Sequence, residues 1–288
     1  MGPRPLVTTK WLFEHLHDAN VRVLDASWYL PSEARDPHAE YAREHIPGTG
    51  FFDIDAVSDS SSELPHMLPA PEIFAEAVQE LGIGDEHFVV VYDGAGIYSS
   101  PRLWWTFLTM GHESCAVLDG GLARWKRENG PTTSELPTHP PGMFTPAAQL
   151  ELLCRCSDLL SNLGQKKWQV VDARSPSRFA GLEKEPRKGV KPGHIPESAN
   201  VYYADLVNSD GTMRSADEIR TIFAKQRIDL SRPIATTCGS GITAAIVYLA
   251  AKIAGARDVA LYDGSWADWG SMENAPIETG PQSERKNP

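Results

Sequence analysis

A cysteine at the end of a predicted strand is the residue of this sequence with the clearest chemical potential. Cys238 follows the apolar run 233–237 and precedes an alanine-rich helical stretch at 244–254. A thiol at such a turn faces free backbone amides and the positive end of a helix dipole, which favour the nucleophilic thiolate. Gly239 and Gly241 allow the loop to curl so that successive amides surround whatever the sulfur carries. The pattern predicts sulfur chemistry rather than a structural cysteine.

The other three cysteines do not form a recognisable framework. Cys115, Cys154 and Cys156 are too few and too irregularly spaced for a disulfide network. The spacing of Cys154 and Cys156 is compatible with half of a metal or redox site, but no second pair of ligands accompanies it. Incidental thiols are therefore the favoured interpretation, and no metal site is expected.

Composition bounds the class of protein. A chain of 288 residues that is 41% hydrophobic and 23% charged suits a soluble globular protein of about two domains. No apolar run approaches the roughly 20 residues of a membrane span, and the N-terminus lacks the features of a signal or transit peptide. A cytoplasmic protein is expected. The net charge of −11 argues against nucleic acid or an anionic membrane as a partner, so local cations must capture any anionic substrate.

The sequence contains an internal repeat with a period of about 145 residues. Four segments recur in the same order, which chance does not produce. At the position of Cys238 the first copy carries Asp93, so a single active site built by the second copy is expected. The first copy then scaffolds or closes that site. The matched segments are 23–27 with 170–174, 45–48 with 194–197, 89–94 with 234–239, and 118–125 with 262–269.

Each copy alternates short apolar strands with helical patterns, which predicts parallel sheets covered on both faces. We expect a first domain at 1–130, a Pro/Gly-rich linker at 131–148 and a second domain at 149–288. The predicted strands are 21–25, 88–92, 116–118, 169–172, 233–237 and 259–262. The predicted helices are 71–81, 101–110, 215–226 and 242–254.

Taken together, these segments resemble the two-domain sulfurtransferases of the rhodanese superfamily, over nearly the whole chain. The resemblance implies an α/β fold of two tandem rhodanese-like domains, each a parallel β-sheet flanked by helices, of which only the second carries the catalytic cysteine. The segments that carry it are 11–12, 24–29, 51–55, 66–69, 101–105 and 262–266.

The loop at 238–243 separates the two main activities of this family. Thiosulfate enzymes resemble Cys-Arg-Lys-Gly-Val-Thr, mercaptopyruvate enzymes resemble Cys-Gly-Ser-Gly-Val-Thr, and this chain reads Cys-Gly-Ser-Gly-Ile-Thr. A dianionic donor would want cationic side chains in the loop, and Gly239 and Ser240 bring none. The resemblance therefore implies transfer of sulfur from 3-mercaptopyruvate. A thiosulfate:cyanide sulfurtransferase (rhodanese) is the alternative, and the two activities can overlap in one protein.

Two arginines are the expected anchors for the substrate carboxylate. Arg178 and Arg187 match the family segment Gly-Arg-Phe-x-Gly-Thr-Glu-Pro-Glu-Pro-Arg at its nine-residue spacing, and a guanidinium can hold a 2-oxo acid by two hydrogen bonds. The segment departs from the pattern at Ser177, Leu182 and Lys184, which leaves both anchors in place. The residues expected to bind substrate or the transferred sulfur are Arg178, Arg187, Gly239, Gly241, Ile242 and Thr243.

The family also uses a serine, histidine and aspartate to move protons. In this chain Ser240 follows the cysteine by two positions, and Asp55 and His66 stand at the family's eleven-residue spacing. The resemblance implies that Asp55 orients His66, His66 polarises Ser240, and Ser240 passes protons near the substrate. His45 and His194 recur in both copies, the inactive one included, and are expected to be structural.

The resemblance implies a ping-pong reaction without a metal or organic cofactor, since Cys238 itself carries the sulfur as a persulfide. Pyruvate leaves first, and a thiol such as thioredoxin or a small thiol, or cyanide, then takes the sulfur. Sulfide production, thiol modification and cyanide removal all remain open as the pathway role, and a monomer is expected. A phosphatase of the Cys-x5-Arg type is disfavoured because Ala244 stands where the arginine would be. A binding module without activity would be expected to lose the cysteine.

Overall fold

A computed structural model describes residues 5–281 and divides them into two compact units. Unit 1 comprises residues up to 60, together with 68–149 and 207–213. Unit 2 comprises 61–67, 150–206 and 214 onward. Each unit therefore holds a short segment that the sequence order would assign to the other half. The outermost residues of both predicted domains lie outside the described part of the chain.

Unit 1 is built on a five-stranded parallel sheet with the strand order β1-β5-β4-β2-β3. Its central strands are runs of valine and other apolar residues buried on both faces, which is typical of a parallel sheet covered by helices. The strands are β1 Leu6–Val7, β2 Val21–Asp25, β3 Gly50–Phe51, β4 Phe88–Tyr92 and β5 Cys115–Leu118. The helices are α1 Thr9–His15, α2 Pro37–Arg43, α3 Pro71–Glu80, α4 Ser100–Thr109 and α5 Gly121–Arg127, with a 3-10 turn at Pro31–Glu33.

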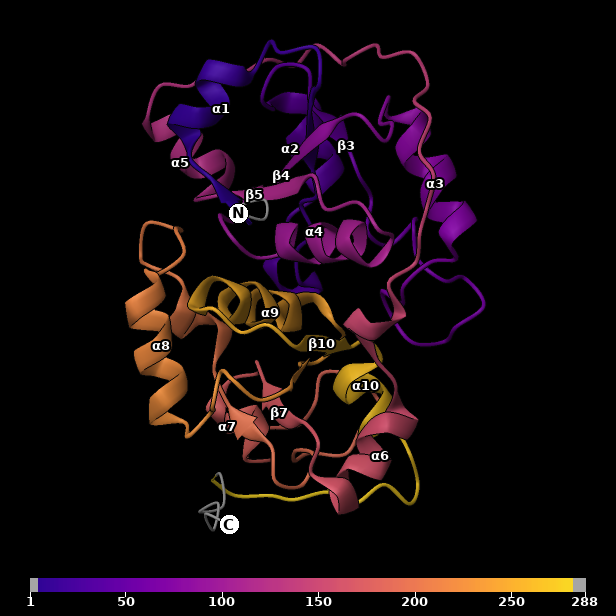
Figure 1. Cartoon of the computed structure of the whole chain (residues 1–288), viewed down its shortest axis with the longest axis vertical. Helices are drawn as coiled ribbons and strands as arrows, with labels where there is room; N and C mark the ends of the chain where they lie inside the picture. The colour runs from indigo at the N-terminus through magenta and orange to yellow at the C-terminus, as the bar shows by residue number, and fades with distance from the viewer. Residues whose placement is uncertain (1–4, 282–288) are drawn as a thin grey trace. The chain divides into compact units, whose positions relative to one another are not determined.

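Unit 2 repeats this architecture, with the strand order β6-β10-β9-β7-β8 and every pairing parallel. The strands are β6 Leu153–Cys154, β7 Gln169–Asp172, β8 Ala199–Asn200, β9 Ile234–Thr237 and β10 Val259–Tyr262. The helices are α6 Cys156–Gln165, α7 Pro176–Phe179, α8 Ala216–Lys225, α9 Ile242–Ala254 and α10 Ser265–Trp269, with 3-10 turns at Leu150–Leu152 and Tyr203–Leu206. Figure 1 shows the helices around the sheet of each unit.

The predicted α/β fold with two similar parallel-sheet domains is confirmed. Each of the ten predicted elements is present within one residue of its predicted bounds at either end. Helix α9 is buried on almost every side and packs against β9 and β10, which explains its largely apolar sequence. Because all strands run parallel, their carboxyl ends gather at one edge of each sheet, where ligands bind in folds of this class.

The stretch predicted to be a linker, 131–148, clusters with unit 1 and runs as extended chain. Its backbone is held by hydrogen bonds between Thr133 and His45 and from Ala147 N to Met110 O at 2.8 Å. Among the described residues, no helix combines the length and apolar character that crossing a membrane requires.

Candidate active site

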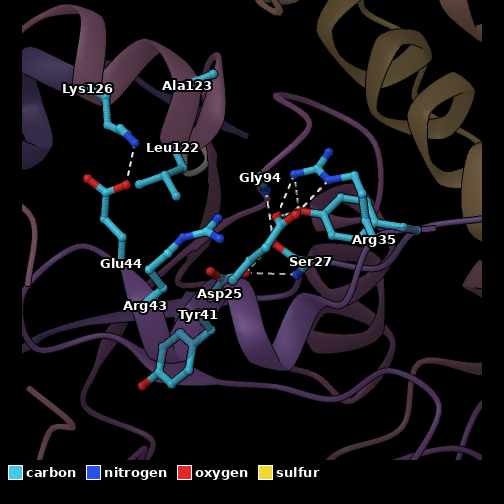
Figure 2. A pocket seen from close by; sticks show the side chains of 12 residues that line it. Asp25, Ser27, Arg35, Tyr41, Arg43, Glu44, Gly94, Leu122, Ala123 and Lys126 are labelled. Atoms are coloured by element: carbon cyan, nitrogen blue, oxygen red, sulfur yellow. Dashed lines mark hydrogen bonds and ion pairs between the residues drawn. The ribbon is translucent and has the colours of Figure 1, made fainter. Parts of the chain in front are cut away.

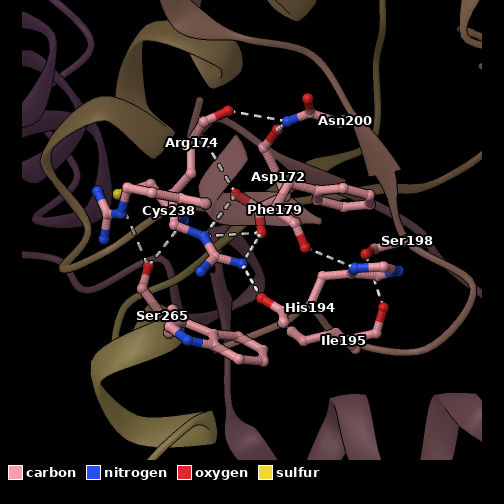
Figure 3. A network of polar contacts seen from close by, with 12 residues as sticks. Asp172, Arg174, Phe179, His194, Ile195, Ser198, Asn200, Cys238 and Ser265 are labelled. Atoms are coloured by element: carbon pink, nitrogen blue, oxygen red, sulfur yellow. Dashed lines mark hydrogen bonds and ion pairs between the residues drawn. The ribbon is translucent and has the colours of Figure 1, made fainter. Parts of the chain in front are cut away.

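Cys238 lies at the carboxyl end of β9 with its sulfur held by the loop that follows. The backbone N–H of Gly241 donates to Cys238 Sγ at 3.1 Å, and the Cys238 N–H donates to Ser265 Oγ at 3.2 Å. The residue is 2% exposed. Figure 3 shows the Ser265 hydroxyl beside Cys238, joined to it by dashed lines. An amide aimed at the sulfur stabilises negative charge there, as expected for a nucleophilic thiol.

Two glycines shape this loop for different reasons. Gly241 caps α9 at φ 84°, a left-handed conformation that residues with a side chain rarely adopt. At Gly239 a Cβ atom would lie 3.2 Å from the Arg178 guanidinium, which is tighter than ordinary contact. The absence of a side chain at Gly239 therefore lets the arginine lie directly against the cysteine loop.

The start of α10 fixes the loop from another direction. Trp266 N donates to Cys238 O and Ala267 N donates to Gly239 O, both at 2.9 Å. Ser265, which begins α10 at φ 50°, also donates from its hydroxyl to Tyr262 O at 2.9 Å. These bonds satisfy the carbonyls of Cys238 and Gly239 and fix the loop against the start of α10.

Unit 1 shows what such a loop does without a cysteine. Asp93, at the matching position, is buried, and its carboxylate accepts from the backbone N–H groups of Tyr98, Ser99 and Ser100 at 2.9, 3.1 and 2.9 Å. The carboxylate of Asp93 thus accepts the hydrogen bonds of the backbone amides at the start of α4. The loop in unit 1 is an anion nest filled by its own side chain.

Arg178, on α7, is oriented by a carboxylate from the following loop. Its Nη2 and Nε donate to the two oxygens of Glu185 at 2.5 and 3.3 Å. The Glu185 side chain is almost fully buried, whereas that of Arg178 is 26% exposed. Nη1 of Arg178 makes no hydrogen bond within residues 5–281. Glu185 fixes the edge formed by Nε and Nη2, and Nη1 would lie 3.7 Å from a Cβ atom at Gly239.

Glu185 also belongs to a buried network that sequence reasoning missed. Arg174 Nη1 donates to Glu185 at 2.9 Å, and Arg174 Nη2 donates to Asp172 at 2.6 Å (Figure 3). Burial lowers the pKa of Arg174, but the charges and hydrogen bonds of Asp172 and Glu185 together raise it by more than burial lowers it. The net shift is upward, and the guanidinium stays charged. Two arginines and two carboxylates thus balance their charges behind the cysteine loop, and this balance positions Arg178.

The remaining residues of the predicted loop belong to unit 2, as Cys238 does. Ser240 is buried, Ile242 is the first residue of α9, and Thr243 is half-buried one position later. Arg187 is half-buried in the segment between α7 and β8, and its carbonyl accepts from Val190 N at 3.4 Å. Its assignment as a second anchor stays a prediction.

The predicted proton relay draws on both units. His66 lies in the N-terminal half of the sequence, yet its segment, 61–67, belongs to unit 2 together with Cys238 and Ser240. It is 7% exposed and adopts φ 60°. Asp55 is an exposed residue of unit 1 whose carboxylate accepts from Trp28 Nε1 at 2.9 Å. The relay of Asp55, His66 and Ser240 stays a prediction.

The other cysteines and the two repeated histidines have structural surroundings. Burial raises the pKa of Cys115, Cys154 and Cys156, which keeps these thiols protonated. His45 and His194 bond main-chain carbonyls of their own units at 2.7 and 2.8 Å, as expected for structural residues. The described part of the chain contains no group of three or more His, Cys, Asp or Glu side chains placed to hold a metal ion.

Comparison with known proteins places the chain among sulfurtransferases. The family model described as a rhodanese-like domain matches residues 8–128 and 156–272. Human 3-mercaptopyruvate sulfurtransferase is 43% identical over 272 residues, covering 92% of each chain. Mouse thiosulfate sulfurtransferase is 42% identical over 283 residues, covering 96% of this chain and 94% of the mouse protein. Overall similarity therefore does not separate the two donors.

A solved structure agrees with this placement. The crystal structure of SseA from Escherichia coli, described with the rhodanese fold and catalytic mechanism of 3-mercaptopyruvate sulfotransferases, superposes with a TM-score of 0.84 at 38% identity. The match covers 92% of this chain and 99% of SseA.

Proposed function

The chain belongs to the rhodanese-like domain family, and from this premise we propose that it transfers sulfur from 3-mercaptopyruvate through a persulfide on Cys238. The observation that carries the choice of donor is the cysteine loop itself. Gly239 and Ser240 place no positive charge beside the sulfur, and the guanidinium of Arg178 lies instead against the Gly239 backbone. A single cation at that position suits a donor whose one carboxylate lies away from the transferred sulfur.

The first half-reaction follows from this arrangement. The Cys238 thiolate attacks the sulfur of 3-mercaptopyruvate and forms an S–S bond, while the C–S bond breaks and its electron pair passes to the carbon as the enolate of pyruvate. A proton taken up at that carbon gives pyruvate, and the cysteine is left as a persulfide. The Gly241 amide, which donates to Sγ at 3.1 Å, supports a sulfur nucleophile at this place.

The proton steps are assigned to the relay predicted from the sequence. Ser240 delivers the proton to the enolate carbon, His66 polarises the serine hydroxyl, and Asp55 orients the imidazole. The burial of Ser240 and His66 in the unit that holds Cys238 is compatible with this assignment.

In the second half-reaction an acceptor thiolate attacks the outer sulfur of the persulfide and regenerates the Cys238 thiolate. We infer that thioredoxin or a small thiol is the acceptor, that cyanide replaces it in an assay, and that sulfide is released when a second thiol reduces the product. We propose that the protein acts as a monomer in the cytoplasm. All four cysteines are free, as is usual for a protein of a reducing compartment. The alternative donor is thiosulfate.

Substitution of the two anchors tests this proposal. Arg178→Gln and Arg187→Gly should each raise KM for 3-mercaptopyruvate about ten- to hundredfold with a smaller change in kcat, because each removes a charge-assisted hydrogen bond to the carboxylate. Steady-state pyruvate release is the measurement. Lys188→Gln, at an exposed position of the same loop, is the matched control and should leave KM unchanged. If neither arginine variant raises KM more than Lys188→Gln does, the assignment of both anchors is wrong.

A further inference from the structure

Unit 1 contains a cavity of about 350 Å³ at the carboxyl ends of its strands, shown in Figure 2. Asp25 at the end of β2 and Gly94 just after β4 contribute to its wall, and Leu122 on α5 lies across from them. The size is within the range of small-molecule sites, and the carboxyl edge of a parallel sheet is where such sites form. The proposed sulfur transfer makes no use of this cavity.

The internal repeat explains why the space exists. Ser27 stands at the position of Arg174 in unit 2, and Leu122 stands at the position of Trp266. In unit 2 these two larger side chains pack together, with the Arg174 guanidinium 4.4 Å from the Trp266 ring. In unit 1 both are replaced by smaller side chains that line the cavity. Unit 1 therefore lacks the guanidinium and the ring at these two positions of the repeat. The guanidinium that does stack on a ring in this cavity, that of Arg35 at 3.7 Å from Tyr29, comes from a different position.

The carboxylate that such a guanidinium would neutralise is retained. Asp25 matches Asp172, which receives hydrogen bonds from Arg174 Nε at 3.1 Å and Nη2 at 2.6 Å. Asp25 is 2% exposed and accepts from Ser27 N and Oγ, but it makes no ion pair within residues 5–281. Burial raises its pKa to about 6 against weaker opposing hydrogen bonds from Ser27 and Tyr92. A buried carboxylate without a cation favours a positively charged ligand.

The other charges of the cavity are paired, with one exception. Arg35 donates to both oxygens of Glu40 at 2.9 and 2.6 Å, and Lys126 pairs with Glu44. The guanidinium of Arg43, by contrast, makes no hydrogen bond or ion pair within residues 5–281. Hydrogen bonds from Arg35 and Lys126 are the main cause of the lowered pKa values of Glu40 and Glu44, and the charge of Arg43 adds to both shifts. Figure 2 draws Arg43 and Asp25 among the side chains that line the cavity, with no bond between them. One carboxylate and one guanidinium thus remain for a ligand that carries both signs of charge.

We propose that this cavity binds a free guanidino acid of the size of arginine. Its guanidinium would bond Asp25, in the place that the Arg174 side chain takes in the other repeat, with its flat face against Leu122. Its carboxylate would bond Arg43. Binding without chemistry is expected, because Asp93 replaces the cysteine in this unit and its carboxylate is already bonded to the α4 amides.

Calorimetric titration of the full chain with four small molecules tests the chemistry of the ligand. L-Arginine should bind. Citrulline has the same shape but carries a neutral urea group in place of the guanidinium, so it should bind at least about tenfold more weakly. Agmatine, which lacks the carboxylate, and arginine amide should be weakened to a similar degree. Absence of arginine binding would overturn the proposal. Equal binding of arginine and arginine amide would also overturn it and would indicate a surface for the arginine side chain of a protein.

Two variants of the cavity locate the binding. Ser27→Arg restores the side chain found in unit 2 and should abolish arginine binding, whereas Ser134→Arg, the same change at an exposed position of unit 1, should leave it intact. Arg43→Gln should weaken binding about tenfold or more without filling the space. Sulfur transfer should persist in all three variants, which shows that they fold. Arginine binding that survives both Ser27→Arg and Arg43→Gln would place the ligand elsewhere.

Discussion

Cys238→Ser should leave no measurable sulfur transfer from 3-mercaptopyruvate, thiosulfate or any other donor. A serine hydroxyl in the same place is a poor nucleophile at neutral pH and cannot hold the sulfur as a persulfide. The loop around it needs no rearrangement, since the Gly241 amide can donate to oxygen as it does to sulfur. The pyruvate released and the thiocyanate formed with cyanide as the acceptor, measured on the same sample, check the result.

The matched control is Cys156→Ser, at a half-buried thiol of the same unit whose pKa burial raises. This variant should retain full turnover. Substantial activity in Cys238→Ser, or loss of activity in Cys156→Ser with the fold intact, would transfer the role of sulfur carrier to another residue.

Arg174→Met should lower the free energy of unfolding by about 3 to 5 kcal/mol, because it leaves the carboxylate of Asp172 buried without its cation. Asp172 and Arg174 are each at most 2% exposed, and three hydrogen bonds from Arg174 Nε and Nη2 join the two side chains. The change also removes one partner of Glu185, which positions Arg178. Urea unfolding followed by circular dichroism measures the first effect, and KM for 3-mercaptopyruvate reports the second.

The double variant Asp172→Asn with Arg174→Met separates charge from packing. It removes the orphaned carboxylate, so it should recover a large part of the stability lost in Arg174→Met. A loss below about 1 kcal/mol in the single variant, or no recovery in the double variant, would show that the ion pair does not hold this part of unit 2.

The central elements of the fold could be predicted from sequence because each carries its own signal. Strands β2, β4 and β7 are short apolar runs, and α9 is an uninterrupted helical pattern that ends at Gly255. The two-residue strands at the sheet edges, such as Leu6–Val7 and Ala199–Asn200, exist only through pairing with a neighbour. A pattern of two residues holds no periodicity, so they could not be predicted.

The candidate site also has a part that the sequence predicts and a part that it does not. The cysteine loop was predictable because a strand, a nucleophile and glycines follow one another within a few residues, and the structure does bring Arg178 against that loop. The network of Asp172, Arg174 and Glu185 depends on burial and on contacts made across the fold, which no local pattern reports. The internal repeat does contain a signal for this network. It aligns Arg174 with Ser27, two residues after matching strands, and a charge present in only one of the two copies indicates that their chemistry differs there.

The most direct test of the central claim is the intact mass of the protein after brief exposure to 3-mercaptopyruvate and, separately, to thiosulfate. A gain of one sulfur, about 32 Da, with stoichiometric release of pyruvate from the first donor and little or no gain from the second, is the predicted result. The same exposure of Cys238→Ser should add nothing. A gain from thiosulfate alone would make thiosulfate the donor. No gain from either donor would contradict the claim that Cys238 carries the transferred sulfur.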